Sequence, residues 1–188
     1  MERSAVMDGG LTITTERGSV PAEARVRTVR ALYTPEQRLR RDATRWTLVQ
    51  GILAPLQFLV FAVSVVLVLR SLLSGEGVLA AHISIIIKTL VLYTIMVTGA
   101  IWEKVVFGQY LFAAPFFWED VVSFVVIALH TVYIGGLLTG RLSTQTLLLV
   151  ALAAYTVYVV NAMQFVLKLR AARLQEAHDA ARRTRELA

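Results

Sequence analysis

Four apolar segments, each long enough to cross a membrane, dominate the pattern of hydrophobic and polar residues. They cover residues 46–69, 77–102, 121–140 and 142–167. The first and the last contain no charged residue, the second is interrupted only by His82 and Lys88, and in the third only His130 titrates near neutral pH. About 20 apolar residues in a helix cross a hydrocarbon core roughly 30 Å thick. The pattern therefore predicts an all-α integral membrane protein with four transmembrane helices.

Polar segments flank and connect these helices. Residues 1–30 mix both charges with several glycines, which predicts a disordered cytoplasmic tail, followed by a membrane domain over residues 31–174. Thr34, followed by proline, is typical of a helix start, so we expect a short basic surface helix up to about Arg45. The bridge 105–117 is too short to cross the bilayer and is predicted to lie at the interface. The fourth helix has no breaker after its apolar part, and residues 175–188 are expected to form a cytoplasmic helical tail.

The basic residues predict the orientation of the four helices. Nine arginines lie in residues 1–45 and six lysines or arginines in residues 168–188, whereas the loops after helices one and three offer only Arg70 and Arg141. The positive-inside rule then places both termini in the cytoplasm. The net charge of +6 is explained by this topology and by attraction to anionic lipid, and we expect no nucleic acid partner. The absence of cysteine excludes disulfides, thiolate nucleophiles and cysteine-bound iron–sulfur clusters.

The polar side chains in or next to the predicted spans gather in their cytoplasmic half. They are Gln50, Gln57, Glu103, Lys104, Glu119, Asp120, Asn161 and Gln164. This asymmetry predicts a polar pocket between the helices that opens toward the cytoplasm. A structural interpretation stays open, because amides also hydrogen-bond between transmembrane helices and charged groups also lie in the headgroup region.

Two residues near the middle of the bilayer are harder to explain as packing. Lys88 lies roughly 16 Å from the nearer end of its segment, so we expect its ammonium to face the bundle interior and to have a partner. His130 follows Glu119 by eleven residues, close to three helical turns, so both should share one face. This histidine either bonds to a neighbouring helix or serves as an axial ligand to a metal inside a flat macrocycle. The chain lacks a glycine-rich phosphate loop, a Gly-x-Ser-x-Gly elbow and a His-Glu-x-x-His pair.

Several long stretches resemble the 3-vinyl bacteriochlorophyllide hydratase family, over about residues 32–174. They are Tyr33-Thr-Pro-Glu-Gln-Arg, Trp46-Thr-Leu-Val-Gln-Gly-Ile-Leu-Ala-Pro-Leu-Gln-Phe, Ile101-Trp-Glu-Lys-Val-Val-Phe-Gly, Phe116-Phe-Trp-Glu-Asp-Val and Tyr158-Val-Val-Asn-Ala-Met-Gln-Phe. The resemblance implies a hydro-lyase of bacteriochlorophyll biosynthesis that adds water to the C3 vinyl group of chlorophyllide a or 3-vinyl bacteriochlorophyllide a, giving a 1-hydroxyethyl group. It also implies a multi-pass protein of the bacterial inner membrane, with other pigment-synthesis enzymes as candidate contacts. No separate cofactor or protein-bound metal is expected, since the magnesium arrives within the chlorin.

This chemistry assigns expected roles to the polar residues. Alkene hydration needs an acid that protonates the terminal carbon and a group that orients water. The catalytic candidates are Glu119, Glu103 and Asp120. We expect Glu119 to be the acid, because neighbouring Asp120 opposes ionisation of both carboxyls, whereas Lys104 favours the charged form of Glu103. Glu103 stays open as the donor, because its place at the end of a helix favours the neutral carboxyl. Lys104 is expected to pair with the substrate propionate at the cytoplasmic mouth. The remaining candidates for substrate binding are His130, Gln57, Asn161, Gln164 and Lys88.

Two other functional classes remain open from the sequence. A non-enzymatic chlorin carrier or photosystem assembly factor could use the same pocket and His130. A small transporter would use Lys88, but the polar residues gather on one side of the membrane and do not form a path across it.

Overall fold

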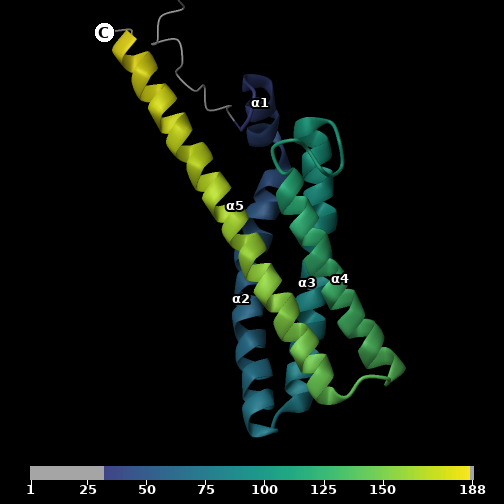
Figure 1. The fold of residues 1–188 in the computed structure, drawn as a ribbon. Helices are drawn as coiled ribbons and strands as arrows, with labels where there is room; N and C mark the ends of the chain where they lie inside the picture. Colours follow the sequence, from purple (N-terminus) through teal and green to yellow (C-terminus); the bar gives the residue numbers. More distant parts are fainter. Residues whose placement is uncertain (1–31, 187–188) are drawn as a thin grey trace, which may run out of the picture. The chain divides into compact units, whose positions relative to one another are not determined.

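The computed structural model describes residues 32–186, which form five helices and no strand (Figure 1). The helices are α1 (Pro35–Ala43), α2 (Arg45–Ser74), α3 (Val78–Phe107), α4 (Phe117–Thr139) and α5 (Thr144–Glu186). Helices α2 to α5 each contain a stretch long and apolar enough to cross a membrane. This confirms the predicted all-helical fold with four candidate membrane spans. The tail expected over residues 1–30 lies outside the described residues.

The four long helices are organised as two hairpins. Helix α2 packs along α3 and α4 packs along α5, while contacts of α2 with α5 and of α3 with α4 join the hairpins (Figure 1). Gly75 ends α2 and Gly140 ends α4, with φ angles of 74° and 62° that favour glycine. Each turn is only a few residues long, so consecutive helices are antiparallel neighbours.

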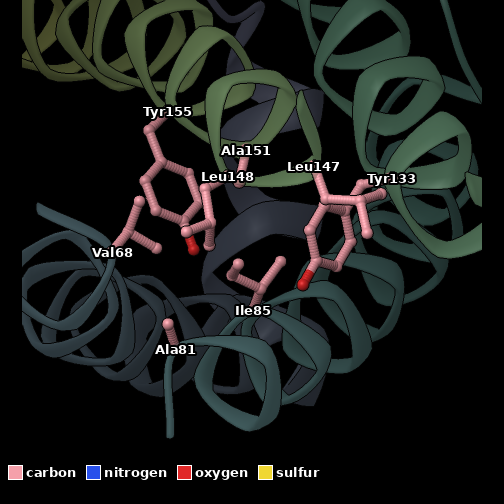
Figure 2. Packing of buried hydrophobic residues seen from close by; sticks show 8 residues of the cluster. All are labelled: Val68, Ala81, Ile85, Tyr133, Leu147, Leu148, Ala151 and Tyr155. Atoms are coloured by element: carbon pink, nitrogen blue, oxygen red, sulfur yellow. The ribbon is translucent and has the colours of Figure 1, made fainter. Parts of the chain in front are cut away.

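A cluster of buried apolar residues holds the hairpins together at the end opposite the bridge between α3 and α4. It consists of Val68, Ala81, Ile85, Tyr133, Leu147, Leu148, Ala151 and Tyr155 (Figure 2). Figure 2 shows both tyrosine hydroxyls turned toward α2 and α3. The Tyr155 hydroxyl lies 2.5 Å from Ser64 Oγ, and the Tyr133 hydroxyl lies 2.5 Å from His82 Nδ1. Buried phenol groups thus find polar partners on the other hairpin.

One glycine allows the close approach of the α4–α5 turn. A Cβ atom on Gly136 would lie 2.5 Å from Leu142 Cδ1, whereas a Cβ atom on Gly135 would meet nothing within 4 Å. Gly136 therefore permits tight packing that a larger residue would disturb.

The short helix α1 begins where the sequence predicts. Thr34 accepts a hydrogen bond from the N–H of Gln37, and the Gln37 side chain bonds back to the Thr34 N–H, which forms a capping box. Helix α1 is tied to the far part of α5, because Arg41 Nη1 lies 3.0 Å from Glu176 Oε1. Helix α5 continues unbroken past residue 174, so the division at 174/175 stays a prediction.

Candidate active site

Three carboxylic acids come together where α3 ends and α4 begins. Gly108 ends α3 with a φ angle of 88°, and residues 109–116 connect to α4 without crossing to the other end of the bundle. Glu103 therefore comes close to the first turn of α4, which carries Glu119 and Asp120. All three side chains are buried, with 4 to 5% of each residue exposed. Carboxyl groups at this depth need hydrogen-bond or charge partners.

Glu103 and Asp120 form a pair that the connecting loop holds in place. Ala113 N–H donates to Glu103 Oε2 at 3.1 Å, and Phe112 N–H donates to Asp120 Oδ2 at 2.6 Å. The two carboxyl groups also lie within hydrogen-bonding reach of each other. A hydrogen bond between them requires one proton, because an ionised carboxylate only accepts. Phe112 has a φ angle of 58°, an uncommon conformation for an aromatic residue, and its bond to Asp120 helps to stabilise it.

Glu119 has a different partner, the lysine that begins the polar part of α5. Lys168 Nζ lies 2.5 Å from Glu119 Oε2 and also donates to the Pro115 carbonyl. This ion pair joins the first turn of α4 to α5. The sequence predicted a role for Lys168 only as one of the basic residues that orient the helices in the membrane. Its spacing from Asn161 and Gln164 was the signal that these three side chains share one helix face.

The buried face of α4 continues from the carboxyls toward the middle of the bundle. Glu119 and His130 both lie on it, as their spacing predicts, with Ser123 between them. Asn161 Nδ2 donates to Ser123 Oγ at 2.8 Å, and its Oδ1 atom has no hydrogen-bond partner within residues 32–186. His130 Nδ1 lies 2.8 Å from the Val126 carbonyl, which assigns the proton to Nδ1 and leaves the buried Nε2 lone pair without a partner in the described chain.

Lys88 lies inside the bundle, as its position in the sequence predicts. It is 0% exposed, and its Nζ atom lies 3.8 Å from the centre of the Tyr158 ring. Within the described part of the chain, Nζ has no hydrogen-bond acceptor and no carboxylate pairs with it. The expected partner is thus an aromatic ring, Tyr158, which the sequence interpretation had not singled out as a partner.

Of the remaining candidates, some bond within the protein and others keep a buried oxygen atom without a partner in the described residues. Gln50 Nε2 donates to Thr98 Oγ1 at 2.8 Å and so joins α2 to α3. The Oε1 atoms of Gln57 and Gln164 are buried, and neither has a partner in residues 32–186. Lys104 is exposed, and its ammonium donates to the Gly108 carbonyl at 2.8 Å, at the end of α3.

Aromatic side chains from the segment before α1, from α3 and from the loop after it form a cluster of their own. Tyr33 is 3% exposed and stacks on Phe107, with ring centres 5.8 Å apart, and Trp102 and Phe116 pack beside them. Burial raises the pKa of the Tyr33 phenol above its ordinary value, so the ring stays neutral here. The burial of the three carboxyls themselves strengthens their electrostatic interactions.

The arrangement combines three chemical capacities on side chains of α3, α4 and α5. The Glu103–Asp120 pair can deliver and recover a proton, the Asn161 carbonyl oxygen can accept a hydrogen bond from water, and His130 Nε2 can ligate a metal. These capacities suit an acid-catalysed addition of water to an apolar, metal-containing substrate.

The comparisons with known proteins agree with this chemistry. The family model of 2-vinyl bacteriochlorophyllide hydratase matches residues 33–171. A 2-vinyl bacteriochlorophyllide hydratase of Rhodobacter capsulatus is 69% identical over 150 residues, which are 80% of this chain and 87% of that protein. The protein of the same name from Cereibacter sphaeroides is 70% identical over 145 residues, covering 77% and 90% of the two chains. No solved structure matches the chain. On the family match and these two relatives, the chain belongs to the 2-vinyl bacteriochlorophyllide hydratase family.

Proposed function

We propose that this protein adds water to the vinyl group of a magnesium chlorin, chlorophyllide a or 3-vinyl bacteriochlorophyllide a, in bacteriochlorophyll synthesis. The locants 2 and 3 in the two forms of the family name number the same vinyl-bearing ring position by two conventions. The observation that carries the proposal is the buried pair of neighbouring carboxyls Glu103 and Asp120 in a chain of this family. The product carries a 1-hydroxyethyl group.

The reaction proceeds in two proton-balanced steps. A proton from the Glu103–Asp120 pair adds to the terminal vinyl carbon, and the positive charge spreads from the inner carbon into the conjugated ring. Water then adds to the inner carbon and returns one proton to the pair, so that the acid is regenerated. The Asn161 Oδ1 atom, buried and without a partner in residues 32–186, is suited to orient this water.

The contacts favour the Glu103–Asp120 pair over Glu119 as the proton donor. A hydrogen bond between two carboxyls needs a proton on one of them, whereas Glu119 already forms an ion pair with Lys168 at 2.5 Å. In this proposal Glu119 positions Lys168 and the loop carbonyl of Pro115. Glu119 remains the alternative donor from the sequence, and the variants described below separate the two assignments.

His130 is proposed to bind the magnesium that the substrate carries. Its Nδ1–H bond to the Val126 carbonyl orients the ring and leaves Nε2 as the ligand atom. His130 and Asp120 are ten residues apart on α4, which corresponds to about 15 Å along the helix axis. A chlorin held between them would have its apolar disc in the bundle and its vinyl edge toward the carboxyls. Gln57 and Gln164 are proposed to contact the pigment from α2 and α5.

The proposed membrane is the bacterial inner membrane, cytoplasmic or intracytoplasmic, with both termini and the bridge between α3 and α4 on the cytoplasmic side. Single cysteines at Gly108, Gly75 and Ser143 test this topology in an otherwise cysteine-free chain. An impermeant thiol reagent should label position 108 only from the cytoplasm, and positions 75 and 143 only from the periplasm. Labelling of position 108 from the periplasm would refute the orientation. Contact with other pigment-synthesis enzymes stays a prediction.

The assay for the proposed function uses purified protein in detergent with each of the two vinyl pigments. A hydratase adds the mass of one water to the pigment and removes the vinyl group, as mass spectrometry can measure. A carrier or assembly factor binds the pigment and leaves the vinyl group intact, and that outcome would contradict the proposal.

A further inference from the structure

The buried ammonium of Lys88 is not used by the reaction described above. Six polar side chains on helices α2 to α5 have an unpartnered buried atom within residues 32–186, and of these only Lys88 ends in an amine that is fully cationic in water. The six are Gln57, Ser71, Lys88, His130, Asn161 and Gln164. A lysine held inside a transmembrane bundle is costly unless an anion or a polar group compensates it.

The side chains of the described chain supply no anion for Lys88. The three buried carboxyls lie at the end of α3 and the start of α4, and their partners are each other, the loop N–H groups and Lys168. Glu103 follows Lys88 by fifteen residues on α3, which corresponds to about 22 Å along the helix axis. The Tyr158 ring at 3.8 Å gives a cation–π contact, which stabilises the ammonium but leaves its three N–H donors unbonded.

Tyr158 also connects Lys88 with the surface that α2 and α5 present to lipid. A groove of about 250 Å³ lies on this surface, with Phe58 from α2 and Tyr158, Ala162 and Met163 from α5 among its lining residues. The lining is apolar, and Phe58 and Met163 are exposed. An apolar disc that bears one carboxylate matches both features, because its ring edge fits the groove and its charge complements the ammonium behind Tyr158.

We propose that Lys88 binds the free carboxylate of the chlorin, which enters from the bilayer at the α2–α5 groove, and thereby selects the acid over its esters. This inference rests on the proposed function for the identity of the pigment. An ester in the same place would leave the ammonium buried without a counter-charge. The site therefore disfavours the binding of esterified pigments and favours the binding of acids. Lys88 is thus a specificity-determining residue, and Lys104 at the exposed end of α3 is the competing candidate for the same carboxylate.

The test compares the binding of chlorophyllide a with that of its methyl ester, measured from pigment absorbance in detergent. The wild type should bind the acid about tenfold or more tightly than the ester, because the acid makes a charge-assisted bond to a buried lysine. In Lys88→Met this ratio should fall to about one, while Lys104→Met should keep the wild-type ratio. Equal binding of acid and ester by the wild type overturns the proposal, as does a preference lost in Lys104→Met but kept in Lys88→Met.

Thermal unfolding without pigment provides a second measurement. If Lys88 awaits a ligand, removal of its uncompensated charge in Lys88→Met should raise the unfolding temperature of the empty protein. A lower unfolding temperature together with an unchanged acid-to-ester ratio would show a structural lysine and overturn the proposal. Both measurements are independent of hydration, so a protein that binds acids selectively but leaves the vinyl group intact would contradict the proposed function alone.

Discussion

Glu103→Gln is expected to lower the hydration rate by about 100-fold or more while pigment binding stays near the wild-type level. The amide keeps the local structure, because its oxygen can accept from Ala113 N–H and its NH₂ group can donate to Asp120. It cannot deliver a proton to the vinyl carbon. Rates are measured from the mass gain of the pigment at saturation, and binding from pigment absorbance.

Glu119→Gln is the matched comparison for this variant. If the Glu103–Asp120 pair is the donor, Glu119→Gln should keep hydration within about tenfold of the wild type wherever the variant remains folded. Near-normal hydration by Glu103→Gln with an inactive Glu119→Gln would assign the proton to Glu119, as the neighbouring charges in the sequence suggested. If the pair is the donor, Asp120→Asn should resemble Glu103→Gln, because both carboxyls belong to the pair.

The second large effect concerns stability and the Lys168–Glu119 pair. Lys168→Met should lower the free energy of unfolding by about 3 kcal/mol, because it leaves the carboxylate of Glu119 buried without its counter-charge. The Lys168 side chain is 26% exposed, which places the expected loss at the lower end for buried ion pairs. Arg170→Met, an exposed substitution on the same helix, is the control and should change stability by no more than about 0.5 kcal/mol.

The double variant Lys168→Met/Glu119→Gln separates stability from catalysis. Replacing the carboxylate by a neutral amide removes the uncompensated charge, so most of the lost stability should return. This protein should also hydrate the pigment, if Glu119 serves only to position Lys168 and the loop. A double variant that is as stable as the wild type but inactive would contradict that role.

Much of the fold followed from the sequence, because a bilayer restricts the secondary structure that an apolar segment can adopt. Every backbone polar group in hydrocarbon must be bonded internally, so each of the four apolar segments could only be a helix. The capping signals at Thr34 and Pro35 likewise predicted α1, since caps depend on local hydrogen bonds. The interior position of Lys88 followed from its place near the middle of an apolar segment.

The partners of the polar residues could not be obtained in the same way. Adjacent residues in the sequence suggested that Asp120 would act on Glu119, and Lys104 on Glu103. In the folded chain Asp120 instead bonds to Glu103 from another helix, Glu119 pairs with Lys168 from α5, and Lys104 bonds to a backbone carbonyl.

The sequence by itself determined the helices and the set of chemical groups, because hydrophobicity, period and caps act over short distances. Only the tertiary structure decided which carboxyl lies beside another carboxyl and which pairs with a lysine. The physical reason is that neighbouring residues on a helix point in directions about 100° apart, so their nearest charges come from other helices. The packing of the two hairpins and the loop that joins them therefore decided the proposed chemistry of each carboxyl.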